Sequence, residues 1–240
     1  MKIPPPDLSY LSQQVDRLGR ELVDTWFDAG SPQIGPAPPD TLQATRDLLA
    51  VLHPYTDRPA DAEPDKELRA LGEHGLHLLE TLAHQARSLD LSEQARQLRH
   101  LSFPLALWLA RRGGEFGTLE PVADAVAELA NGLSAPRELA ELHGMIEELV
   151  DATLPTPGRA RRPRHAWRVL VLNRAIVATR SHRPPLMEEA FNALAELLPD
   201  DAAGFFQEAM EQMDIVGYPD HVRDVVERHY RRHCGNRTLH

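Results

Sequence analysis

The sequence predicts an all-α protein built from antiparallel helical hairpins, stacked as a short α-solenoid or packed as an irregular helical bundle. Apolar residues recur at spacings of three and four along most of the 240-residue chain, which is the period of a helix with one buried face. Alternating apolar and polar runs, which mark half-buried strands, are nearly absent. Clusters of proline and glycine cut the chain into segments of helix length. A chain of this length can bury a sizeable core as one large domain or two small ones.

The N-terminal part, up to about residue 64, is expected to hold two helices separated by proline-rich loops. Asp7 or Ser9 can cap the first helix, because their side-chain oxygens accept hydrogen bonds from the first free amide groups. The leucine-rich stripe that follows predicts that this helix continues to Gly30. After a loop that contains four prolines, Asp40 is placed to cap a shorter helix over residues 41–52.

We expect residues 1–64 to pack on or beside a main helical domain, residues 65–240. Pro104 should kink or split one helix of that domain, because proline cannot donate a backbone hydrogen bond. The apolar run at residues 167–172 could also form a strand, but a strand would have no partner here, so we favour a buried helix. The helices predicted for this domain span residues 65–88, 91–112, 118–132, 135–152, 164–180, 185–198, 200–214 and 219–233.

Two segments of the main domain share a layout. Residues 99–132 align without gaps on residues 167–200, at an offset of 68 positions. In both, a strongly apolar helix is followed by a polar turn and an amphipathic helix that carries Ala-Glu-Leu near its end. This offset is twice the repeat length of about 34 residues that is typical of stacked helical hairpins. The pattern predicts two related hairpin units, at about residues 98–152 and 164–233.

On this layout the chain resembles tetratricopeptide-type hairpins, over at most residues 98–233. Phe205 matches the aromatic residue of the first helix in such a repeat, and Ala209 matches the small residue four positions later. Val225 matches an apolar position of the second helix. The resemblance implies stacked hairpins with a concave surface for a partner. The chain departs from the pattern where an aromatic, a small residue and a closing proline are expected, at Gln212, His221 and His233.

Charge is unevenly distributed along the sequence. The formal net charge is −10, which argues against a general affinity for nucleic acids. Residues 152–187 nevertheless contain no Asp or Glu and carry eight arginines. The candidate residues for binding an anion or a partner lie at the front of this span: Arg159, Arg161, Arg162, Arg164 and Arg168.

Two interpretations of these arginines remain open. In the first, acidic helices on either side of the span pair with them inside the fold, and Arg174 is the arginine we expect in a buried pair. In the second, the loop arginines at positions 159, 161 and 162 face solvent and bind a phosphate-bearing ligand, an RNA or an acidic protein.

Histidine spacing offers weak metal candidates. His77 and His84 share a helix face with Glu73 and Glu80, and His229 and His233 are four residues apart. No Glu-x-x-His pair of the di-metal type occurs in the chain, so a solvated polar face is the favoured interpretation of the first cluster. We predict neither a metal nor another cofactor.

No P-loop, nucleophile elbow or dinucleotide fingerprint occurs in the sequence. The N-terminus lacks the apolar core of a signal peptide, no apolar run is long enough to span a bilayer, and Cys234 is the single cysteine. We therefore expect a cytoplasmic, non-catalytic module or scaffold that binds another protein and has no membrane partner; a homo-oligomer stays open. The alternatives are nucleic-acid or phosphoanion binding through residues 159–168 and, last, a metal-dependent helical enzyme.

Overall fold

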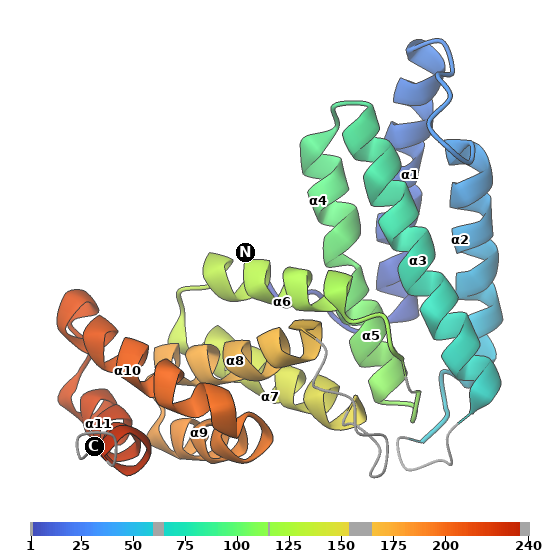
Figure 1. Ribbon diagram of the computed structural model, residues 1–240. Helices are drawn as coiled ribbons and strands as arrows, with labels where there is room; N and C mark the ends of the chain where they lie inside the picture. Colours follow the sequence, from blue (N-terminus) through green and yellow to red (C-terminus); the bar gives the residue numbers. More distant parts are fainter. Residues whose placement is uncertain (1, 60–64, 115, 154–164, 236–240) are drawn as a thin grey trace. The chain divides into compact units, whose positions relative to one another are not determined.

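A computed structural model describes residues 2–59, 65–114, 116–153 and 165–235, and these ranges contain helices and no strand (Figure 1). The predicted all-α class is confirmed. No helix in these ranges is both long enough and apolar enough to cross a bilayer. The helices are α1 (Leu8–Asp28), α2 (Pro38–Leu52), η1 (a 3₁₀-helix, His53–Tyr55), α3 (Lys66–Ser88), α4 (Ser92–His100), α5 (Ser102–Ala110), α6 (Glu120–Gly132), α7 (Pro136–Ala152), α8 (His165–Arg180), α9 (Pro184–Leu197), α10 (Pro199–Val216) and α11 (Asp220–Cys234).

The chain divides into two compact units. The first, which we call the N-terminal unit, comprises residues 4–126 and 148–160. The second, the C-terminal unit, comprises residues 1–3, 127–147 and 161–240. The boundaries therefore fall within α6 and α7, and the division expected at about residue 64 lies inside the N-terminal unit. No boundary falls near residue 64 because α1 and α2 pack directly on the helices that follow them, α1 on α4 and α2 on α3.

The helices of the N-terminal unit begin where side-chain caps predict them. Asp7 caps α1 by accepting a hydrogen bond from the amide of Tyr10 at 2.9 Å. Asp65 caps α3 through the amides of Glu67 and Leu68. By contrast, α2 begins at Pro38, so Asp40 lies in its first turn and is not its cap. Proline suits a first turn because it lacks the amide that would have no partner there.

The long helix predicted over residues 91–112 is split into α4 and α5. Proline at position 104 removes one amide and crowds the carbonyl four residues earlier, so a continuous helix cannot pass this point. The chain breaks at Leu101, and the hydroxyl of Ser102 lies 2.7 Å from the carbonyl oxygen of Arg99 and 2.8 Å from that of Pro121. Nearly all residues of α5 are buried, including Trp108.

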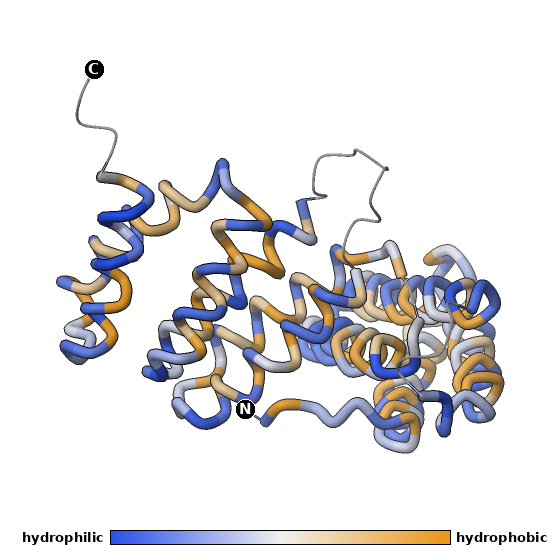
Figure 2. Tube along the Cα trace, turned by 90° about the horizontal axis from the view of Figure 1, so that it is seen from below, coloured by the Kyte–Doolittle hydropathy of each residue, from blue (hydrophilic) through white to orange (hydrophobic). Residues whose placement is uncertain are grey.

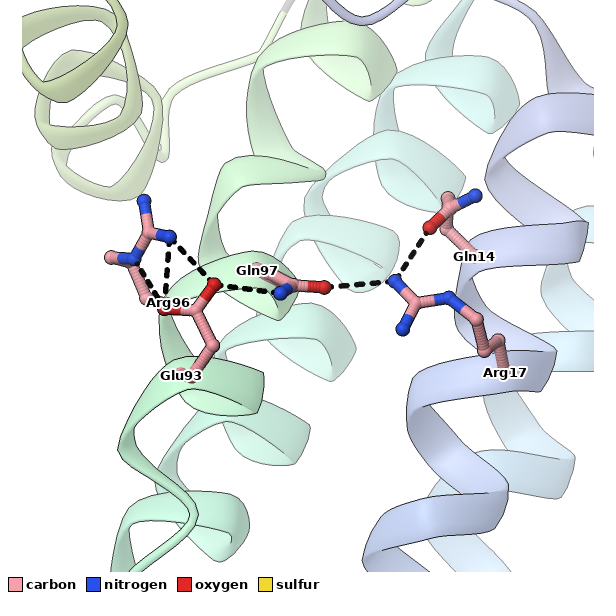
Figure 3. A network of polar contacts seen from close by, with 5 residues as sticks. All are labelled: Gln14, Arg17, Glu93, Arg96 and Gln97. Carbon is pink, nitrogen blue, oxygen red and sulfur yellow. Dashed lines mark hydrogen bonds and ion pairs between the residues drawn. The ribbon is translucent and has the colours of Figure 1, made fainter. Parts of the chain in front are cut away.

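A polar network joins α1 and α4 on the surface of the N-terminal unit (Figure 3). Arg17 donates to Gln14 at 2.9 Å and to Gln97 on α4 at 2.8 Å. Gln97 in turn donates to Glu93 at 2.7 Å, and Arg96 forms an ion pair with the same carboxylate. These hydrogen bonds lower the pKa of Glu93 to about 2.

The described helices of the C-terminal unit form two successive hairpins. Helix α8 packs on α9, α10 packs on α11, and α9 also contacts α10 and α11. Residues 167–172 lie in α8, so the strand interpretation is wrong; Trp167 and Leu170 are buried in this strongly apolar helix. The turn from α10 to α11 contains Gly217 at φ +72°, a left-handed conformation that suits glycine.

Along most helices, apolar and polar residues alternate within each turn (Figure 2).

An aromatic cluster fills the space between α9, α10 and α11. The ring of Phe191 lies edge-on to Phe206 and to His229, with centroids 5.2 Å apart in both pairs. His233 stacks on Phe206 at 5.2 Å, and Phe205 meets Phe191 at 5.8 Å. Edge-to-face and offset stacking of this kind adds about 0.5–1.5 kcal/mol per pair to the burial of the rings. The cluster therefore stabilises the packing of the second hairpin, α10 and α11, on α9.

Candidate interaction groove

The arginine-rich span is only partly described. Arg159, Arg161, Arg162 and Arg164 lie outside the described residues, and their predicted role stays a prediction. Arg168 lies on α8 and donates from Nε to the carboxylate of Asp201 on α10 at 2.7 Å, with a second bond from its Nη2 atom. This two-bond ion pair raises the pKa of Arg168. Arg168 is exposed, but its charge is paired with a carboxylate of the same chain, in the manner of the first interpretation of the span.

Arg174 is the buried arginine that the sequence led us to expect. Only 5% of its side chain is exposed, and its guanidinium pairs with Glu147 on α7 and with Glu189 on α9. His143 is buried beside it, and burial together with the positive charge of Arg174 lowers the pKa of His143 to about 4. A buried cation thus connects three helices of the C-terminal unit.

Arg180 is also used by the fold. Its guanidinium donates to the carbonyl oxygens of Ala130 and Leu133, at the end of α6, the second at 2.6 Å. The last carbonyl groups of a helix have no partner within it and carry partial negative charge, so a cation there stabilises the helix end.

A groove lies between α8 and α10, with a cavity of about 280 Å³. We call it the α8/α10 groove. Its walls are Ile176, Thr179 and Arg180 from α8 and Phe205, Ala209 and Met213 from α10. The three residues from α10 are spaced by four, so they lie along one face of that helix. Glu208, Gln212 and Tyr218 complete the rim.

The polar groups in the groove walls already have partners. The hydroxyl of Thr179 donates to the carbonyl of Ala175 at 2.9 Å, and the guanidinium of Arg180 is held at the end of α6. The Tyr218 ring packs edge-on against His182 at 5.6 Å, and burial raises the pKa of Tyr218. The groove therefore offers mainly apolar surface, with polar groups at its rim.

Exposed apolar side chains extend this surface. Ile176 is 41% exposed, Ile215 75% and Val216 59%. Val216 follows Gln212 by four residues and Ile215 follows Glu208 by seven, so both continue the stripe of α10 that lines the groove. Contiguous exposed apolar surface next to a pocket is typical of a binding site.

The surroundings of the groove are acidic. Residues 184–222 contain nine Asp and Glu and no Lys or Arg. On α10, Asp201 is paired with Arg168, and Asp214 is paired with Arg223 at 2.8 Å. Glu208 and Glu211 are exposed, and no residue in the described part of the chain forms an ion pair with either. Of these two carboxylates, that of Glu208 lines the groove and is available to a partner there.

The first metal candidate is not assembled on α3. Glu73 turns to the loop before α6, where it accepts hydrogen bonds from the Gly117 amide, the Thr118 amide at 3.1 Å and the Thr118 hydroxyl. His77 and His84 are exposed. Within the described ranges, no group of three or more His, Cys, Asp or Glu side chains is arranged to hold a metal ion. A solvated face with one structural carboxylate accounts for this cluster.

The second metal candidate is part of the aromatic cluster. His229 is buried, and its Nε2 lies 2.8 Å from the carboxylate of Glu188, which Arg228 also contacts. Burial opposes ionisation of Glu188, but these hydrogen bonds outweigh it and lower the pKa of that carboxyl. The ring of His233 stacks on the ring of His229 with centroids 6.1 Å apart. The two rings face each other by stacking, and the nitrogen of His229 that could bind a metal is directed at Glu188.

The groove residues were missed by sequence reasoning, which predicted a concave surface without locating it. Ile176 and Ala209 are far apart in sequence and meet only because α8 and α10 pack near each other, with α9 between them along the chain. One signal was present: Ile215 and Val216 are large apolar residues beside the helix-ending Gly217, in a stretch without basic residues.

No model of a known protein family, no curated protein and no solved structure matches this chain. The resemblance to tetratricopeptide-type hairpins therefore stays a prediction from the sequence.

Proposed function

We propose that this protein is a non-catalytic interaction module that binds a segment of a partner protein in the α8/α10 groove. The observation that carries the proposal is the cavity of about 280 Å³, which is lined by the exposed Ile176, together with the exposed side chains of Ile215 and Val216 on α10. Leaving such apolar surface in water costs roughly 25 cal/mol per Å², and burying it against a partner recovers this free energy.

The dimensions of the groove favour a peptide segment. A cavity of this volume lies at the lower end of the range for small-molecule sites, about 300–1,000 Å³. It can take one large side chain as an anchor, while the neighbouring apolar stripe of α10 contacts the next turn of the same segment. Interfaces commonly place such an anchor in a pocket and surround it with weaker contacts. Two successive hairpins also supply a rigid wall on each side, because α8 and α10 are each packed on a second helix.

Site-specific photocrosslinking in the native host tests the proposal. Gln212→benzoylphenylalanine places a reactive group at the groove rim, and Gln207→benzoylphenylalanine places the same group on α10 at an exposed position outside the groove. We expect a discrete crosslinked protein at position 212 and none at position 207. The crosslink should disappear when Ala209→Trp fills the groove. Equal crosslinking at both positions, or a crosslink that survives Ala209→Trp, would contradict the proposal.

A further inference from the structure

We infer that the segment which docks in the α8/α10 groove is cationic, with one large apolar side chain flanked by Lys or Arg. This inference rests on the proposed function and specifies its partner. Exposed apolar residues and the unpaired carboxylate of Glu208 lie on the same face of α10, and a basic amphipathic segment complements both.

Glu208 and Glu211 are two acidic residues of α10 without an ion pair among the described residues. Both are exposed on α10, and Glu208 lines the groove itself. They are three residues apart and therefore neighbours on the helix surface, where like charges repel. In the described part of the chain, no arginine or lysine forms an ion pair with either carboxylate. A cationic side chain from a partner would relieve this repulsion by pairing with Glu208 in the groove.

Two other carboxylates of α10 are already paired. Asp201 in its first turn pairs with Arg168, and Asp214 in its last turn pairs with Arg223. Arg180, the one cation among the groove residues, is directed at the carbonyl groups of Ala130 and Leu133. Its positive charge therefore faces the negative end of α6. Glu208 is consequently the groove carboxylate that is left for a cation of the partner.

The apolar side chains of α10 determine which partner geometry fits. Phe205 and Ala209 in the groove and Val216 beyond it lie on one stripe along α10, whereas Met213 is itself buried. A partner helix that lies along this stripe presents apolar residues at spacings of three and four. A basic residue beside the apolar ones then faces Glu208, which lines the groove. Such rim pairs mainly increase the association rate and make binding sensitive to salt.

Selection from a random peptide display library against the full-length chain tests both parts. We expect the selected peptides to carry a large apolar residue beside Lys or Arg and to lose binding to the Ala209→Trp variant. The double variant Glu208→Gln/Glu211→Gln should weaken their binding by about 2- to 5-fold, the equivalent of the one exposed ion pair that Glu208 forms at the groove. Raising the salt concentration should weaken binding to the native chain more than to the double variant.

Two control variants match these changes outside the groove. Gln207→Trp adds the same side chain to α10, and Glu196→Gln removes one exposed carboxylate from α9. Both should bind the peptides as the native chain does. If Ala209→Trp alters the circular dichroism or melting temperature, Gln212→Trp replaces it, because Gln212 is exposed at the rim.

The outcomes separate the two proposals. Peptides that need the open groove but are neutral or acidic, or that bind the double variant equally well, would overturn the cationic partner and leave the interaction module standing. If no selected peptide loses binding to the groove-filling variant, the proposed function itself is wrong. Self-association of the full chain that depends on concentration and is abolished by Ala209→Trp would overturn the inference in favour of a second copy as the occupant.

Discussion

The two units of this protein are both helical, but their cores contain different chemistry. The described core of the N-terminal unit is aliphatic and leucine-rich, and its buried polar side chains are neutral: Thr41, Thr45, Gln85 and Ser102. The C-terminal unit buries two histidines and an arginine: His143, His229 and Arg174. Its stability therefore depends on protonation and on ion pairing, whereas that of the N-terminal unit depends on packing.

Loss of the buried arginine should have the largest effect. Arg174→Ala removes the cation between Glu147 and Glu189 and leaves a cavity among three helices. We expect the C-terminal unit to lose about 3 kcal/mol of unfolding free energy, near the lower end for a broken buried pair because both carboxylates are partly exposed. Hydrogen exchange should show faster exchange in α8 and α9 and no change in α1–α3.

Arg183→Ala is the matched control for this variant. Arg183 is exposed and lies at the start of α9, so its loss should change the unfolding free energy by less than about 0.5 kcal/mol. If Arg174→Ala behaves in the same way as this control, the buried ion pair does not stabilise the unit.

The pH dependence of stability should come next in size. The pKa of His143 is lowered to about 4 in the folded protein, from its ordinary value of 6.5. The unfolded chain therefore binds a proton more readily, and stability should fall as the pH drops from about 6.5 to about 4. The full shift corresponds to a loss of about 3 kcal/mol by pH 4. Glu188 and Glu189, whose pKa values are lowered, should lose their contribution only below about pH 4.5.

His143→Leu separates these two pH windows. Without this imidazole, the unfolding free energy measured with urea should fall much less between pH 6.5 and pH 4.5, and the remaining slope should come from His233, whose pKa is also lowered by burial. The exposed His165 offers a control, because His165→Leu should leave the slope of the native protein unchanged. A slope that survives His143→Leu undiminished would assign the pH dependence to another group.

Gly→Ala substitutions within helices should change the stability in opposite directions in the two units, by a smaller amount. A Cβ atom at Gly19 in α1 would come within 2.3 Å of Leu42 on α2, whereas one at Gly204 in α10 meets nothing within 4 Å. Gly204→Ala should stabilise the protein by about 0.5–1 kcal/mol through helix propensity. Gly19→Ala should destabilise it by about 1 kcal/mol, because overpacking outweighs the same gain. Thermal melts of the two variants should shift in opposite directions, and shifts of the same sign would contradict the packing contrast.

The smallest effect is expected for the surface network of α1 and α4. Arg17→Ala removes the bonds to Gln14 and Gln97 seen in Figure 3. Because these side chains are largely exposed, the loss should be about 0.5 kcal/mol and should shrink in high salt. A loss above about 1.5 kcal/mol in urea denaturation would show that this network holds the two helices together more strongly than exposed pairs do.

Local signals made most of the fold predictable. Asp7 and Asp65 cap helices where the sequence places them, and prolines mark the first turns of α9 and α10. The buried state of Arg174 was predictable too, since a charged residue inside a strongly apolar helix flanked by acidic helices needs a partner. The caps and first-turn prolines depend on neighbours within one turn, and Arg174 pairs with carboxylates of the two helices that precede and follow α8 along the chain.

The site was not predictable to the same degree, because it depends on which helices meet. The α8/α10 groove combines residues from two helices that are separated by α9 along the chain. The engagement of Arg168 by Asp201 spans the same pair of helices. Sequence periodicity reports which face of a helix is apolar, but not which part of that face stays uncovered after packing.

The distribution of tryptophans has a practical consequence for the contrast between the units. Trp26 and Trp108 belong to the N-terminal unit, and Trp167, buried in α8, is the only tryptophan of the C-terminal unit. In a chain with Trp26→Phe and Trp108→Phe, intrinsic fluorescence would come from Trp167 alone. Exposure of a buried indole to water shifts its emission to longer wavelengths, so the C-terminal unit carries its own optical reporter of unfolding.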